Sequence, residues 1–150
     1  MLTLEIYERG IFVLKKIGAS ELAIRGFAAH PLLQSNEDLS SVWKNKPAWL
    51  QEMDTSVLLL AMEYRKTANF YLSEHLDQRS IELSPIKEVN DMLIADKVQN
   101  RKDFEKHHLG SHPRSKELDK YFRQWLEKLG ISEDKYHSLV KEILRKTGQK

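Results

Sequence analysis

Apolar residues recur at three- and four-residue steps along most of the chain, which is the pattern of amphipathic helices. The serines Ser20, Ser35, Ser115 and Ser132 are expected to cap four of these segments at their starts, and glycines and prolines mark other boundaries. The expected helices cover about residues 3–17, 20–30, 35–43, 57–72, 85–108, 115–129 and 132–148, with one further turn of helix at 47–50. The sequence therefore predicts an all-α protein, one domain over residues 1–150, with six or seven helices in an irregular orthogonal bundle.

The segment Val57-Leu58-Leu59-Leu60-Ala61-Met62 is apolar on all sides. Leu, Ala and Met favour helix, and the helical pattern continues beyond them towards residue 72. A helix that is apolar all round is expected at the centre of a bundle. We therefore predict that 57–72 is the central, buried helix. Glu63 and Arg65 lie at the end of its apolar section.

A second feature is a carboxylate on an apolar stripe. Ser84 is a plausible N-cap and Pro85 suits the first turn of the helix that follows. Its apolar stripe runs through Ile86, Val89, Leu93 and Phe104. Asp96 and Asn100 fall on the same stripe, three and seven residues after Leu93. A carboxylate that faces a core costs several kcal/mol unless it is paired or bound to a cation. Asp96 is therefore expected to pair with a buried Arg or Lys, or to bind a metal, unless the stripe is wider than these residues indicate.

Composition narrows the functional classes. The chain has no cysteine, so disulfides and thiolate metal sites are excluded. It has neither an apolar run near 18 residues nor a signal-peptide pattern, and the expectation is a cytoplasmic protein without a membrane partner. Residues 97–150 carry 14 Lys and Arg against 8 Asp and Glu. This basic third could attract a phosphate-bearing ligand, although a solvated helical surface explains it better, and no aromatic–basic interleaving supports nucleic-acid binding.

Three histidines lie within six residues, at His107, His108 and His112. Histidine-rich tracts can bind metals. Their spacing matches no zinc signature, and a loop between helices commonly holds solvated histidines. We favour the solvated interpretation.

One segment resembles a known family. Ile94-Ala95-Asp96-Lys97-Val98-Gln99-Asn100 is similar to the Leu-Ala-Asp-Arg-Leu-His-Asn segment of the RelA/SpoT-type HD domain, which hydrolyses guanosine tetraphosphate alarmones. Two further stretches resemble the family, namely Tyr121 with Lys128-Leu129-Gly130-Ile131, and His30-Pro31-Leu32. The resemblance implies an HD-like fold. It also implies that His30 is the first and Asp96 the last ligand of a catalytic metal, and that Asn100 shapes a nucleotide site.

The sequence departs from the family at the other metal ligands. The family has a His-Asp pair at the end of the apolar helix and a Glu-Asp pair one turn later, where this chain has Met62-Glu63 and Lys66-Thr67. A thioether is a poor ligand for the divalent ions that such hydrolases use. Glu63 could still ligate, which leaves His30, Glu63 and Asp96 as the implied set for a divalent metal such as Mn²⁺. The acidic residues that would activate a water are missing.

Two functions follow from the resemblance. In the first, the protein hydrolyses or binds a phosphorylated nucleotide or small phosphate ligand, with Glu63 and Asp96 as catalytic metal ligands. Its phosphates and base would be oriented by Arg65, Lys97, Asn100 and Arg101.

In the second, the protein is a catalytically inactive HD-like module that binds a partner, such as another protein, without a metal. Asp96 and Glu63 would then be held by internal cations such as Arg65. A third and weaker hypothesis is a helical protein that contacts nucleic acid through its basic third.

Overall fold

The computed structural model describes residues 2–73 and 81–148, and within these ranges the chain forms α-helices, one 3-10 turn and no strand. The prediction of an all-α protein is thus confirmed. The described elements are α1 (Leu2–Lys16), α2 (Glu21–Ala29), η1 (His30–Leu32), α3 (Asn36–Asn45), α4 (Ala48–Glu52), α5 (Thr55–Ser73), α6 (Lys87–His107), α7 (Ser115–Lys128) and α8 (Glu133–Lys146). The described part holds eight α-helices rather than six or seven, because the predicted turn at 47–50 is a separate helix, α4.

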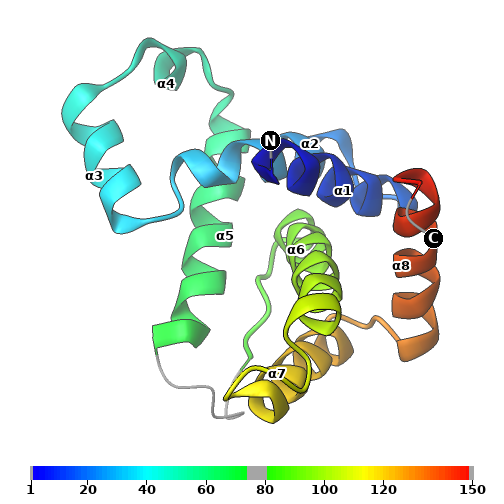
Figure 1. The fold of residues 1–150 in the computed structure, drawn as a ribbon. Helices are drawn as coiled ribbons and strands as arrows, with labels where there is room; N and C mark the ends of the chain where they lie inside the picture. The colour runs from blue at the N-terminus through cyan, green and yellow to red at the C-terminus, as the bar shows by residue number, and fades with distance from the viewer. Residues whose placement is uncertain (1, 74–80, 149–150) are drawn as a thin grey trace.

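The central helix is α6, which packs against α1, α2, α5, α7 and α8 (Figure 1). Val89, Met92, Leu93, Ala95 and Val98 are all fully buried along it. The prediction that 57–72 is the central helix was therefore wrong. Leu59 of α5 is 60% exposed, and α5 packs mainly on α2 and α6.

The central position of α6 was not apparent from the sequence because this helix buries charged side chains. Lys97, Arg101 and Lys102 are all at most 5% exposed, and each has an acidic partner. Charged residues are rarely buried unless they are paired. Reading them as surface residues makes α6 look amphipathic, with only one apolar stripe.

The N-terminal helices meet at glycines. A Cβ atom at Gly10 of α1 would collide with the ring of Phe27 on α2. A Cβ atom at Gly26 would lie 3.1 Å from Cβ of Leu60 on α5. The two glycines thus let α1, α2 and α5 approach closely beside α6.

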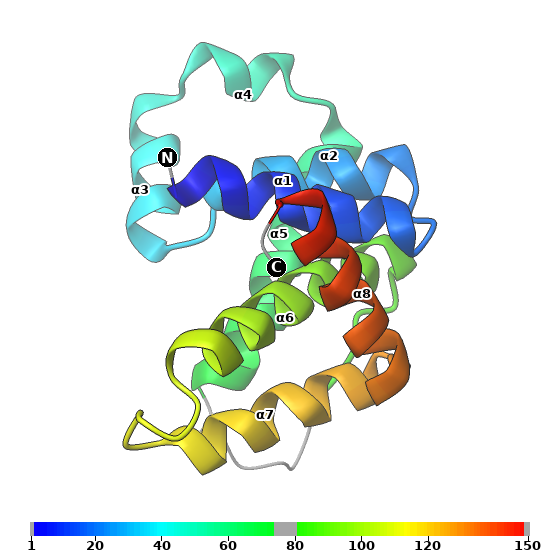
Figure 2. The ribbon, with the colours of Figure 1, turned by 45° about the vertical axis from the view of Figure 1, so that its right-hand side comes forward.

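Residues 33–54, which carry α3 and α4, are called the arm here. Figures 1 and 2 both show α3 and α4 standing away from α6, α7 and α8. Neither α3 nor α4 has a buried residue. Two polar contacts tie the start of the arm to α5: the Arg65 guanidinium donates to the side chain of Asn36, and Nδ2 of Asn69 donates to the Gln34 carbonyl at 3.5 Å.

Three predicted helix starts are confirmed by their caps. The hydroxyl groups of Ser20, Ser35 and Ser132 each accept a hydrogen bond from the backbone N–H three residues further on. Ser35 and Asp38 form the complete reciprocal capping box.

Two other predicted caps were wrong. The helix α6 begins at Lys87, and Ser84 instead accepts from the N–H of Ile86 in the loop before it. Ser115 is the first residue of α7 rather than its cap, and its hydroxyl accepts from the N–H of Gly110. In both cases the hydroxyl satisfies a loop amide close to the helix start, which a sequence pattern cannot tell from a cap.

Among the helices described, none combines the length and the apolar character needed to cross a lipid bilayer.

Candidate functional site

Asp96 lies in a compact group of polar side chains on the core side of α6. Its carboxylate lies close enough to the phenol of Tyr64 on α5 for its charge and hydrogen bonding to act on that phenol. Its Oδ2 lies 3.3 Å from Nζ of Lys97, the next residue on α6. The Asp96 side chain remains 23% exposed, whereas the Lys97 side chain is 6% exposed. We call His30, Tyr64, Asp96, Lys97 and Tyr121 the Asp96 cluster.

The Lys97 ammonium is held by aromatic rings as well as by Asp96. Nζ donates to the hydroxyl oxygen of Tyr121 at 3.1 Å. It also lies 5.2 Å and 4.9 Å from the ring centroids of Tyr121 and Trp125 on α7, within the range of cation–π attraction. Burial alone would lower the pKa of Lys97, but Asp96 and Tyr121 outweigh it, so the pKa lies above its usual value. Lys97 is therefore a buried cation.

Tyr64 supplies the second contact to Asp96. Its side chain is almost fully buried in the core. Burial raises the pKa of the Tyr64 phenol well above its usual value, and the Asp96 charge and hydrogen bond raise it further. The phenol therefore stays protonated and donates to the carboxylate. With Lys97, it gives Asp96 the partners that a poorly hydrated anion requires.

His30 packs beside this group at the start of η1. Its ring lies between Phe27 and Tyr64, with centroid separations of 4.9 Å and 4.5 Å. Nδ1 is hydrogen-bonded to the carbonyl of Phe27, so Nδ1 is the protonated nitrogen of the neutral ring. Burial lowers the pKa of His30, although the Phe27 carbonyl and the Asp96 charge oppose this shift. His30 is thus a mainly neutral histidine whose ring packs at a tilt against the Tyr64 ring beside Asp96.

The structure brings together two of the three predicted metal ligands. His30 and Asp96 interact electrostatically in the Asp96 cluster. Glu63 is engaged elsewhere, since its Oε1 accepts a hydrogen bond from Oγ of Ser84 at 3.1 Å. Among the residues that the structure describes, no three His, Asp or Glu side chains are grouped so that they could hold a metal ion.

The predicted phosphate-binding residues are dispersed. Asn100 is exposed on α6, while Lys97 points into the cluster. Arg65 binds Asn36 at the start of the arm rather than Asp96. The internal cation beside Asp96 is therefore Lys97, not Arg65 as the sequence suggested.

Arg101 lies in a separate ionic network. Its side chain is fully buried, and its two terminal nitrogens donate to Glu133 on α8 at 2.9 Å and 2.8 Å. The guanidinium also forms an ion pair with Glu105 at 2.8 Å and lies 3.8 Å from the ring centroid of Tyr136. In this geometry Arg101 fastens α8 to α6.

The histidines at the end of α6 and in the loop that follows it form a loosely spaced group. The N–H of His112 donates to the carbonyl of His108 at 2.9 Å, which places their rings 6.1 Å apart. Nδ1 of His112 accepts from the N–H of Arg114 at 3.0 Å, so its lone pair is already engaged. All three histidines are exposed, as a solvated loop would have them.

Sequence reasoning missed Tyr64 as a member of the site. The buried positions of α5 include Val57, Leu60, Ala61, Tyr64 and Ala68, which follow helical spacing. That spacing could have shown Tyr64 facing the core. A phenol on a core-facing stripe needs a hydrogen-bond partner, and Asp96 was the acidic residue that needed a donor.

Comparisons with models of known protein families, with curated proteins and with solved structures found no match for this chain. The side chains of the Asp96 cluster determine what chemistry it can perform. Its carboxylate can accept hydrogen bonds or hold a cation, and the Lys97 ammonium neutralises one negative charge. The phenols of Tyr64 and Tyr121 fix these two charges in place.

Proposed function

We propose that this protein is a non-catalytic helical binding module with an HD-like arrangement, in which Asp96 stabilises the fold instead of holding a metal. The observation that supports this proposal is the pairing of Asp96 with Tyr64 and Lys97. In the RelA/SpoT-type HD domain that the sequence resembles, the corresponding Asp binds the metal. Here a phenol and an ammonium group satisfy the carboxylate.

A charge argument supports the same proposal. A divalent cation at Asp96 would lie beside the buried Lys97 ammonium, whose side chain is 6% exposed. Two like charges a few ångströms apart in a poorly solvated site repel each other by several kcal/mol. The metal would have to displace Lys97 from Asp96 or shift its protonation. Lys97 therefore competes directly with any cation for the Asp96 carboxylate.

A second candidate is the metal-assisted hydrolysis of a phosphorylated nucleotide. The proximity of His30 and Asp96, the first and last ligands implied by the resemblance, favours it. The Asp96 side chain also remains 23% exposed. This function would require Glu63 to leave Ser84 and join the other two side chains, while Lys97 turned towards a phosphate.

Calorimetric titration of the metal-free protein with Mn²⁺ and Zn²⁺ distinguishes the two candidates. We expect no one-to-one binding that depends on Asp96.

We also expect Asp96→Ala to lower the free energy of unfolding by about 3–5 kcal/mol, because the substitution leaves a buried ammonium without its anion. Urea unfolding measures this loss.

Asp91→Ala is the matched control, since Asp91 lies on the same helix and pairs with Lys87 at 2.6 Å. The Lys87 side chain is 76% exposed, so it keeps its hydration and the loss should stay below about 1 kcal/mol. Tight one-to-one metal binding that disappears in both Asp96→Ala and Asp96→Asn would refute the structural role. An assay of guanosine tetraphosphate hydrolysis would then be the next step.

A further inference from the structure

A groove runs between η1 and the arm, with a volume of about 350 Å³. Its apolar lining consists of Pro31, Leu32, Val42, Pro47 and Trp49. Leu32 is 47% exposed although it is a large apolar residue. The groove is thus an accessible hollow with an aromatic ring and two proline rings in its walls, of a size that suits a few side chains of a peptide.

The polar part of the groove is rich in acceptors. Asp38, Ser41 and Asn45 line it from successive turns of α3. Both hydrogen bonds that Asp38 accepts from Ser35 end on Oδ2, which leaves Oδ1 as an acceptor. The Ser35 hydroxyl and backbone N–H lower the pKa of Asp38, so this carboxylate stays ionised into the acid range. No cationic side chain lines this groove to neutralise it.

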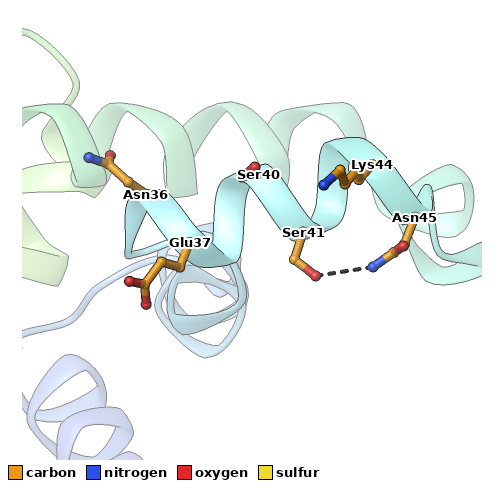
Figure 3. A pocket seen from close by; sticks show the side chains of 6 residues that line it. All are labelled: Asn36, Glu37, Ser40, Ser41, Lys44 and Asn45. Atoms are coloured by element: carbon orange, nitrogen blue, oxygen red, sulfur yellow. Dashed lines mark hydrogen bonds between the residues drawn. The ribbon is translucent and has the colours of Figure 1, made fainter.

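A second hollow lies next to this groove on the same helix and differs in character. It has a volume of about 490 Å³ and is lined by polar side chains of α3 alone, including Glu37 and Lys44 (Figure 3). The Asn45 amide donates to the Ser41 hydroxyl at 3.2 Å, and this pair separates the two hollows. Glu37 has Lys44 on its own side and no apolar wall opposite. Of these two hollows, the Asp38 groove is the one in which a carboxylate lies with apolar side chains in the lining.

We infer that the Asp38 groove is the partner-binding surface of this module, and that its occupant is a peptide segment carrying a proline or aromatic residue next to Lys or Arg. The apolar walls would take the ring, and the Asp38 carboxylate would take the cation. An ionised carboxylate with no lining cation favours a cationic partner over an acidic one. This inference rests on the proposed function, since it names the partner class of the binding module.

Phage display of random 12-residue peptides against the full chain tests the inference. We expect enriched peptides in which Lys or Arg stands within about three residues of Pro, Trp, Tyr or Phe. A fluorescein-labelled synthetic copy should bind at least 10-fold more weakly to Trp49→Ala. It should bind about 3- to 10-fold more weakly to Asp38→Asn, with a smaller dependence on salt concentration.

Each variant has a matched control on α3. Glu37→Gln removes one negative charge from the neighbouring hollow. Trp43→Ala removes a tryptophan that is 76% exposed and lies outside the groove lining. Both controls should keep the wild-type affinity. Circular dichroism and unfolding curves identify any variant that loses its fold, and Val42→Asp then provides a second disruption of the apolar wall.

The inference would be overturned by a library that yields no specific peptide, by enriched peptides that are acidic, or by binding that Trp43→Ala weakens as much as Trp49→Ala. Self-association of the chain through this groove in sedimentation velocity would also overturn it. The metal titration at Asp96 is a separate readout, so failure of the peptide assignment and failure of the proposed function can be told apart.

Discussion

At the scale of single residues, the protonation states of the side chains in the Asp96 cluster depend on one another. Tyr64 remains neutral, Lys97 remains charged, and His30 is held mainly neutral by burial between two rings. The charge on Asp96 favours the neutral phenol of Tyr64 and the charged form of Lys97, and the His30 ring packs against Tyr64. A change in one protonation state should therefore be visible in the stability of the whole protein.

His30 gives this dependence a pH range. Its pKa in the folded protein lies below its ordinary value of 6.5, so the unfolded chain binds its proton first as the pH falls. The stabilisation is complete above about pH 6.5 and is lost progressively as the pH falls towards the folded pKa. Urea unfolding at pH 7.5, 6.5 and 5.5 should show decreasing stability.

The substitution His30→Phe should flatten this slope, because it removes the titrating group and keeps an aromatic ring between Phe27 and Tyr64. A slope that persists unchanged in His30→Phe would show that other groups cause it.

At the scale of the helices, Arg101 joins α8 to α6. The buried guanidinium bonds to Glu133 through two nitrogens and stacks on Tyr136. Arg123 of α7 reaches the same carboxylate, with its Nη1 3.0 Å from Oε2 of Glu133. One glutamate near the start of α8 thus receives cations from two helices.

We expect Arg101→Met to lower the free energy of unfolding by about 2–3 kcal/mol. This is less than the roughly 3–5 kcal/mol for a fully buried pair, because the carboxylates of Glu105 and Glu133 remain within reach of water. Arg123→Met, whose arginine side chain is 48% exposed, should cost less than about 1 kcal/mol. Equal losses from the two substitutions in urea unfolding would contradict a special role for Arg101.

The helices were predictable because their apolar spacing and caps are local signals. Three serines mark helix starts through a hydrogen bond to the backbone N–H three residues further on: Ser20, Ser35 and Ser132. The centre of the bundle was not predictable in this way. Arg101 is buried because Glu133, 32 positions away, lies beside it, and no local pattern contains that information.

The candidate site shows the same limit. The sequence singled out Asp96 as a carboxylate in need of a partner, and the structure supplies that partner. It did not indicate which side chains would meet it, since Tyr64 comes from another helix and Lys97 is the adjacent residue. The choice between metal and internal cation depends on that three-dimensional arrangement.

At the scale of the whole molecule, the arm and the helices around α6 differ in how they are stabilised. The helices around α6 share one apolar cluster that includes Leu14, Met92, Trp125 and Ile143. The two helices of the arm contribute no buried side chain. Regions with few buried apolar contacts open locally at a lower free energy than the core.

Hydrogen exchange should reveal this difference directly. We expect the amides of α3 and α4 to exchange about 100-fold faster than those of α6 after correction for intrinsic rates, because the arm can open without unfolding α6. Mass spectrometry of the native protein measures both sets in one experiment. Equal protection of arm and α6 would mean that they unfold as one unit.

The arm also bears on how this protein can change over generations. Substitutions in α6 alter packing against five helices at once, so few sequences satisfy that position. The exposed positions of α3 and α4 are not constrained by packing in this way, because neither helix has a buried residue. They can accept new side chains while the helices around α6 keep their arrangement. Substitutions can therefore accumulate on the surface of the arm without disturbing the packing around α6. The side chains on this surface can diverge faster than the fold.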